Sequence, residues 1–134
     1  MFTHNLFFFT LKAIQNLENN INLQTLDLAG NRIKELTGLQ SLSKLEEFWF
    51  NDNLLEDWSQ IERLSCLTQL NTVYFERNPV QKDINYRRKI KLALPKLVQI
   101  DANLCRWKIH DSYAALFFNI PYSFNFSIPY LTFF

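Results

Sequence analysis

The sequence contains few of the residues from which catalytic and metal sites are built. It has only two His, two Gly and two Cys among 134 residues. It contains no Gly-rich phosphate loop, and no GxGxxG, HExxH or GxSxG spacing. Both histidines, His4 and His110, lie in the irregular end segments, where we expect neither to be functional. We therefore expect no enzyme activity, no cofactor and no metal site.

The cysteines and the charge exclude further classes of protein. Cys66 and Cys105 lie far apart without a CxxC or Cys/His cluster, which argues against a disulfide scaffold or a zinc site. A reducing, intracellular compartment is therefore expected. The net charge of +1 gives no global attraction to nucleic acid or to an anionic membrane. The first residues lack the basic start and long apolar run of a secretory signal peptide.

What the sequence does contain is an internal repeat. LQTLDLAGNRIKELTGLQSLS starts at Leu23, and LEEFWFNDNLLEDWSQIERLS starts 22 residues later at Leu45. Both fit LxxLxLxxNxI/L with a trailing LxxLxxL, which is the leucine-rich-repeat pattern. A third copy, LNTVYFERNPV, starts at Leu70, and residues 11–17 supply the back half of an earlier copy. We expect the array to begin with this incomplete repeat.

The pattern predicts an α/β leucine-rich-repeat solenoid. Each LxL unit forms one strand of a parallel sheet on the concave side, and the leucines that follow line the convex side of the same core. The pattern asparagines, Asn31, Asn53 and Asn78, are expected to form a buried ladder that binds backbone groups where the chain leaves each strand. Replacing one of them by leucine is expected to cost about 1–3 kcal/mol.

A helical cap is expected after the repeats. The periodicity stops at Asn78-Pro79, and apolar residues then recur at a spacing that suits a short helix ended by Pro95, followed by a strand-like LVQI. The side of this cap that covers the last coil is expected to hold Ile84, Ile90, Leu92, Leu94 and Leu97.

These patterns divide a single domain into four parts. We expect a divergent segment over residues 1–10, leucine-rich repeats over 11–77 and the cap over 78–107. Residues 108–134 are rich in Phe and Tyr, and they follow neither a helical nor an alternating period. Prolines and polar residues interrupt them, which argues against a membrane span. We expect this tail to be disordered, or to be translated non-coding sequence.

One row of outward-facing residues is unusual. Alternation sends the residue between the last two apolar positions of each strand to the concave surface. This row consists of Asp27, Trp49 and Tyr74, and it is continuous because parallel strands lie about 4.8 Å apart. Trp49 either covers the sheet by stacking on Tyr74 or awaits a partner as a binding hot spot, and we favour the second interpretation. The preceding outward positions hold Thr25, Glu47 and Thr72.

The repeats and the cap also resemble a known family. EFWFNDNLLEDWS, TVYFERNPVQKD and YRRKIKLALPKLVQIDA are similar to the last repeats and cap of regulatory subunit 7 of type-1 protein phosphatase, over about residues 11–107. The resemblance implies a protein of the nucleus and cytoplasm whose concave face binds the phosphatase catalytic subunit. It implies partner-contacting roles for Asp27, Glu47, Trp49 and Tyr74.

The charge distribution leaves two other interpretations to weigh. Residues 46–63 are acidic and suit a partner with a basic patch, whereas residues 82–96 carry six Lys and Arg. The basic cap allows a ribonucleoprotein-associated scaffold, although no aromatic stacking platform accompanies it and we expect no nucleic acid partner. An enzyme would use Asp27, Glu47 and Asp52, but an open solenoid surface offers no enclosed pocket to raise a pKa.

Overall fold

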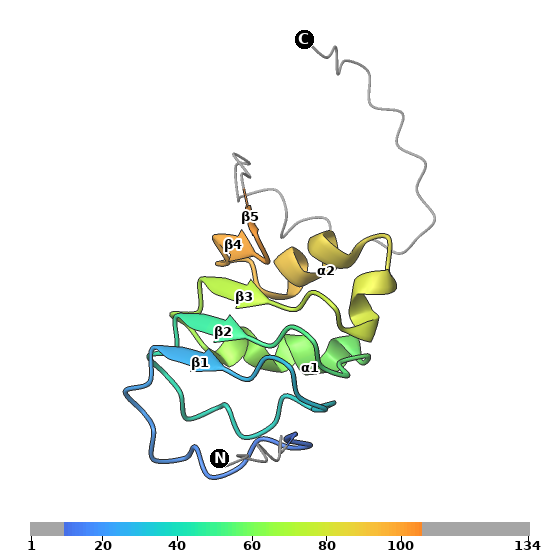
Figure 1. Cartoon of the computed structure of the whole chain (residues 1–134). Coiled ribbons are helices and arrows are strands. Elements are labelled where there is room, and N and C mark those ends of the chain that lie inside the picture. The colour runs from blue at the N-terminus through green and yellow to red at the C-terminus, as the bar shows by residue number, and fades with distance from the viewer. Residues whose placement is uncertain (1–9, 106–134) are drawn as a thin grey trace, which may run out of the picture.

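The strands form one sheet in the order in which they occur in the sequence. The computed structural model describes residues 10–105, so the predictions for the N-terminal segment and the aromatic tail fall almost entirely outside it. The sheet consists of β1 (Thr25–Asp27), β2 (Glu47–Trp49), β3 (Thr72–Tyr74), β4 (Gln99–Ile100) and β5 (Asn103–Leu104). β1 to β4 pair in parallel, and β5 turns back antiparallel to β4. The stack is visible in Figure 1.

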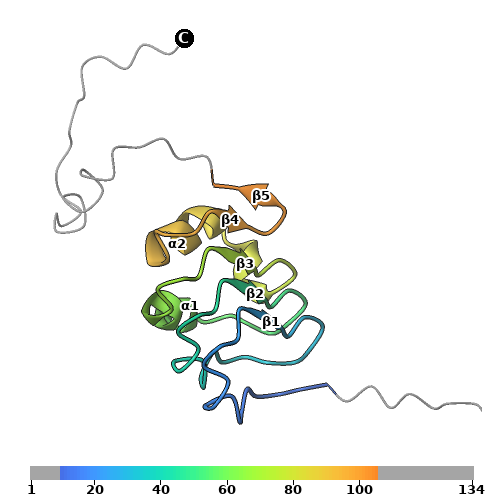
Figure 2. The same cartoon turned by 90° about the vertical axis from the view of Figure 1, so that its left-hand side faces the viewer.

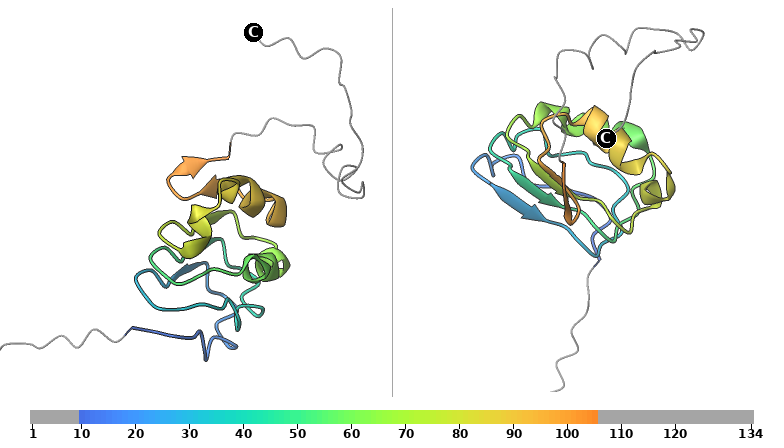
Figure 3. Two further views of the ribbon diagram at one scale, coloured as in Figure 1. Left: turned by 90° about the vertical axis from the view of Figure 1, so that its right-hand side faces the viewer. Right: turned by 90° about the horizontal axis from the view of Figure 1, so that it is seen from above.

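The helices lie on the opposite side of the coils from the strands, as Figures 1 and 2 show. α1 (Trp58–Glu62) continues into a short 3-10 turn, η1 (Arg63–Cys66), because the repeat that starts at Leu45 is longer than the one before it. The cap contains the 3-10 turn η2 (Pro79–Lys82) and α2 (Tyr86–Ala93). The view from above in Figure 3 shows the strands along one edge of each coil and the helices along another. The predicted leucine-rich-repeat solenoid is confirmed.

Aromatic side chains fill the centre of the core. Phe48, Phe50 and Phe75 are fully buried, and their ring centroids lie 5.3 to 6.3 Å apart. Phe48 and Phe50 flank Trp49 in sequence and point inward, so strand alternation turns Trp49 outward. Removing a buried phenylalanine typically costs about 3–5 kcal/mol, so this cluster contributes a large part of the stability of the two coils that contain β2 and β3.

The first coil is less covered than the others. Leu23, Leu26 and Leu28 pack against the core but remain half-buried. Their equivalents in the next coil, Leu45, Phe48 and Phe50, are fully buried. Within residues 10–105, no strand pairs with the outer edge of β1, which accounts for the difference.

Two of the residues predicted for the core side of the cap are exposed, so this part of the prediction is wrong. Ile90, Leu94 and Leu97 are buried as expected, but Ile84 is 98% exposed and Leu92 is 45% exposed. Ile84 precedes the helix, and Leu92 follows Ile90 by two residues, which places it on the other side of α2. The helix position that turns inward with Ile90 is instead Tyr86, four residues before it.

Candidate functional site

The outward side chains of the four parallel strands form one surface, here called the strand face. Strand register places Asp27 beside Trp49 and Trp49 beside Tyr74, which is the predicted row. A second row runs alongside it through Thr25, Glu47, Thr72 and Gln99. Their geometry is therefore established, and the binding role of Asp27, Glu47, Trp49 and Tyr74 stays a prediction.

Trp49 and Tyr74 contact each other at the middle of the strand face. Their ring centroids lie 5.1 Å apart with the ring planes tilted by 47°. Trp49 keeps 38% of its surface exposed, so the contact with Tyr74 covers only part of the indole. The two rings hold each other in place and still present apolar area outward.

Two carboxylates lie next to this aromatic pair. Asp27 is exposed and accepts a hydrogen bond from the backbone N–H of Ala29 at 2.9 Å, which holds its side chain at the end of β1. Glu47 precedes Trp49 by two residues in β2, so both side chains point to the same side of the sheet. Among the described residues, no group donates a hydrogen bond to the Glu47 carboxylate, which leaves it available to a partner.

Gln99 extends the strand face, and the sequence interpretation did not include it. Its Nε2 donates hydrogen bonds to the Tyr74 hydroxyl at 2.7 Å and to the Asp101 carbonyl oxygen at 2.8 Å. The sequence does carry a signal for it, since Leu97 and Ile100 repeat the LxxL spacing that opens each earlier strand. That spacing places Gln99 at the position that Thr72 occupies in β3.

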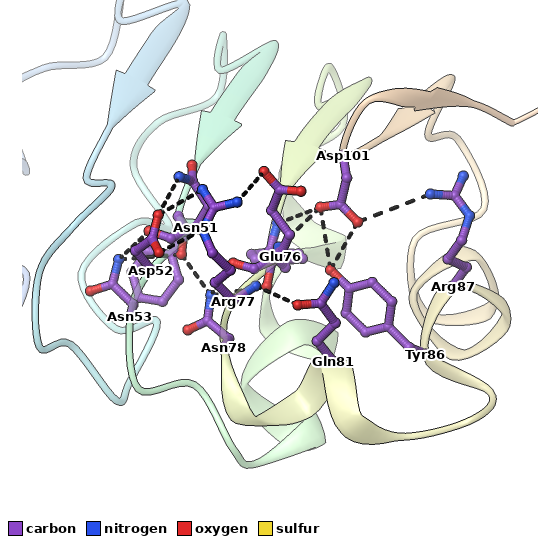
Figure 4. A network of polar contacts seen from close by, with 12 residues as sticks. Asn51, Asp52, Asn53, Glu76, Arg77, Asn78, Gln81, Tyr86, Arg87 and Asp101 are labelled. Carbon is purple, nitrogen blue, oxygen red and sulfur yellow. Dashed lines mark hydrogen bonds and ion pairs between the residues drawn. The ribbon is translucent and has the colours of Figure 1, made fainter.

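Asp101 ends the row of outward residues. It falls at the position that Tyr74 occupies one coil earlier, but it has a φ of 53° and is buried. Its carboxylate accepts hydrogen bonds from the backbone N–H groups of Phe75 and Glu76 and from the Tyr86 hydroxyl. Figure 4 shows the contact between Asp101 and Tyr86. Burial, with the charge of Asp101, raises the pKa of Tyr86. This contact fixes α2 to the last parallel strands.

The asparagines link successive coils where the chain leaves each strand. Asn53 accepts a hydrogen bond from the Ile33 N–H at 3.0 Å and donates one to the Leu28 carbonyl at 2.8 Å. Asn78 makes the same pair of contacts to the coil that contains Asn53. Both are buried, whereas Asn31 is half-buried because it lies in the first coil.

Asp52 is engaged in an ion pair that the sequence did not indicate. Arg77 Nε and Nη2 donate to its two carboxylate oxygens at 2.6 and 2.8 Å (Figure 4). The hydrogen bonds from Arg77 and a further one from Asn51 hold the pKa of Asp52 below its usual value. Asp52 therefore serves to join two coils and is a poor candidate for a proton-transferring acid.

Three of the six basic residues between 82 and 96 bind groups of the cap itself. Arg87 donates to the Ile100 carbonyl at 2.7 Å, and Lys89 pairs with Asp83. Lys91 donates to two backbone carbonyls at 2.6 and 2.7 Å, beyond the end of α2. These contacts hold α2 in place, and they leave fewer basic side chains free to bind an anionic partner.

Neither a metal site nor a membrane helix is evident in the described part of the chain. Over residues 10–105, no three His, Cys, Asp or Glu side chains are grouped so that they could hold a metal ion. In the same range, no helix has the length and apolar character needed to cross a membrane.

Comparison with known proteins agrees with the repeat geometry. The family described as "Leucine Rich repeats (2 copies)" matches residues 21–63, which include β1 and β2. One chain in the crystal structure of the Drosophila melanogaster SNF/U2A′ complex has a TM-score of 0.60 and 23% identity, over 75% of this chain and 72% of that one. That likeness shows the fold alone. The chain is a leucine-rich-repeat protein.

Comparison with individual sequences relates the chain to a narrower group of proteins. The chain is related, over part of its length, to protein phosphatase 1 regulatory subunit 7. The Xenopus tropicalis protein of that name is 59% identical over 54 residues, covering 40% of this chain and 16% of the relative. Protein phosphatase 1 regulatory subunit SDS22 of Schizosaccharomyces pombe is 47% identical over 72 residues, covering 52% of this chain and 22% of the relative. The chain thus spans less than a quarter of the length of either relative.

Proposed function

We propose that this chain is a protein-interaction module that binds the catalytic subunit of type-1 serine/threonine protein phosphatase through its strand face. Trp49 and Tyr74 are the apolar anchors, and Asp27 and Glu47 are polar contacts. The module acts by binding in the nucleus and cytoplasm, without a catalytic step, cofactor or metal of its own. The observation that carries the proposal is the exposed Trp49 ring held against Tyr74. The names of the related regulatory subunits support the choice of partner.

The aromatic pair has the properties of a binding hot spot. Trp49 lies on a strand whose neighbouring side chains are buried, and Tyr74 limits its motion further. A partner that covers the indole therefore removes apolar area from water and immobilises little additional conformational freedom. Side chains of this kind, near the centre of an interface, are the ones whose truncation costs about 2 kcal/mol or more.

The carboxylates determine which partner surface fits. Asp27 lies beside Trp49 through strand pairing, and Glu47 lies two residues before it on the same strand. Both fall at the edge of an aromatic patch, where charges steer association and exclude partners of the same charge. A partner surface with basic residues around an apolar site meets these requirements.

The contacts of the cap argue against the ribonucleoprotein interpretation. Arg87, Lys89 and Lys91 bind carbonyl or carboxylate oxygens of this chain, so three of the six basic residues between 82 and 96 already have acceptors. Binding RNA through these three would require giving up those hydrogen bonds. The strand face is therefore the favoured interaction surface.

Association kinetics with purified phosphatase catalytic subunit test the proposal. We expect wild-type chain to bind, and Asp27→Asn/Glu47→Gln to lower the association rate by about tenfold at low salt and to weaken its salt dependence. The matched control is Glu56→Gln/Glu62→Gln, which removes the same charge from exposed positions away from the strand face. Absence of binding by folded wild-type chain, or an equal effect of both double variants, would contradict the proposal.

A further inference from the structure

We infer that the Tyr74 hydroxyl donates its proton to the partner, and that Gln99 is the positioning residue that fixes the polarity of this hydroxyl. The hydroxyl oxygen accepts a hydrogen bond from Gln99, so its proton points outward. The inference rests on the proposed function and deepens it, because it names the kind of group that the partner places opposite Tyr74. That group is a hydrogen-bond acceptor, either a carboxylate or a backbone carbonyl oxygen.

The first step is the orientation of the Gln99 amide. One end of this amide lies 2.8 Å from the carbonyl oxygen of Asp101. A carbonyl oxygen only accepts hydrogen bonds, so the end of the amide that faces it must be the nitrogen. Turning the amide over would set two oxygens against each other, which fixes Nε2 in this position.

The second step is the polarity of the Tyr74 hydroxyl. The same Nε2 lies 2.7 Å from the Tyr74 oxygen. An amide nitrogen donates and cannot accept, so the tyrosine oxygen is the acceptor in this bond. The hydroxyl proton therefore points away from Gln99. Among residues 10–105, no group accepts that proton, which leaves it available at the surface.

The third step is the placement of this donor. The Tyr74 ring lies between the Trp49 ring, 5.1 Å away, and the Gln99 amide. Both contacts limit its rotation, so the proton is presented beside the exposed indole of Trp49 before any partner arrives. A partner that places a donor there would leave two donors facing each other in a desolvated site, which disfavours it.

Two substitutions of Gln99 separate this polarity from simple packing. Gln99→Glu replaces the donating amide by a carboxylate, which turns away from the Asp101 carbonyl and accepts a hydrogen bond from the Tyr74 hydroxyl. The Tyr74 proton is then no longer available to the partner. Gln99→Met keeps the length of the side chain but removes the hydrogen bond, so the Tyr74 proton remains free. Tyr74→Phe removes the proton itself.

The polarity is measured first on the full chain without a partner. Difference Raman spectra, with Tyr74→Phe subtracted, isolate the Tyr74 ring doublet, whose intensity ratio distinguishes a hydroxyl that accepts from one that donates. We expect a Tyr74 hydroxyl that accepts from Gln99 and donates to water in the wild type, and one that only donates in Gln99→Glu. A Tyr74 that only donates in the wild type would overturn the inference, whatever the chain binds.

Calorimetry with the phosphatase catalytic subunit then tests the role in binding. We expect Tyr74→Phe and Gln99→Glu to weaken affinity about three- to tenfold each, and Gln99→Met by less than about twofold. Because the polarity effect vanishes without the hydroxyl, Gln99→Glu should have far less effect in the Tyr74→Phe background. Wild-type affinity in Tyr74→Phe would overturn this inference alone, whereas absence of binding by wild-type chain would overturn the proposed partner as well. Circular dichroism confirms that each variant is folded.

Discussion

Arg77 binds the Asp52 carboxylate with two hydrogen bonds, of 2.6 and 2.8 Å, across 25 residues of sequence. Both residues have left-handed backbone conformations, with φ of 57° for Asp52 and 56° for Arg77, so the same turn is repeated in adjacent coils. The ion pair joins these two turns on the surface.

This pair makes the stability of the chain depend on pH. Because the pKa of Asp52 is lowered in the folded state, its contribution is present above the ordinary pKa of an aspartate and is lost as the pH falls through the lowered value. We expect Asp52→Asn, which tolerates the same backbone conformation, to lower the free energy of unfolding near neutral pH. Urea titrations should show the difference from wild type shrinking below about pH 4. A difference that is constant with pH, or equal to that of Glu56→Gln, would contradict this account.

The asparagine ladder predicts that the cost of replacing an asparagine is smaller in the first coil than in the next one. Asn53→Leu leaves the buried Ile33 N–H without its partner and removes one of the two hydrogen bonds that the Leu28 carbonyl accepts, since Asn31 donates the other. We expect it to cost about 1–3 kcal/mol in the free energy of unfolding. Asn31→Leu should cost less, because water reaches the half-buried first coil and replaces the lost hydrogen bonds. Chemical denaturation of both variants measures the difference, and equal losses would count against the ladder.

The cap predicts a division of roles between two neighbouring arginines. Arg87→Ala removes the hydrogen bond to the Ile100 carbonyl, so we expect a lower melting temperature. Arg88 is exposed, and Arg88→Ala should leave the melting temperature unchanged. We expect neither the wild-type chain nor either variant to bind single-stranded RNA, at low or at high salt. A steep loss of RNA affinity with salt that Arg88→Ala abolishes would revive the ribonucleoprotein interpretation.

The periodic part of the fold was predictable from the sequence because one strand per repeat imposes its register on the next. The spacing alone places Asp27, Trp49 and Tyr74 in one row, and strand pairing confirms that row. The same periodicity predicts that Phe48 and Phe50 are buried.

The features that the sequence did not predict depend on contacts outside the repeat. Hydropathy predicts Ile84 and Leu92 on the core side of the cap, but both are exposed. Ile84 lies before the helix, which begins at Tyr86, and Leu92 lies on the outward side of the helix. Gln99 and Arg77 acquire their roles from side chains in a neighbouring coil. Such contacts depend on the three-dimensional offset between coils, and a one-dimensional pattern does not record them.

The affinity of the Trp49→Ala variant for the phosphatase catalytic subunit tests the central claim most directly. Leu92→Ala is the matched control, since it truncates an exposed apolar side chain on α2, away from the strand face. Binding calorimetry should show a loss of about 2 kcal/mol or more for folded Trp49→Ala, roughly thirtyfold in Kd, and no loss for the control. Wild-type affinity in folded Trp49→Ala would mean that the indole only covers the sheet, and it would contradict the account.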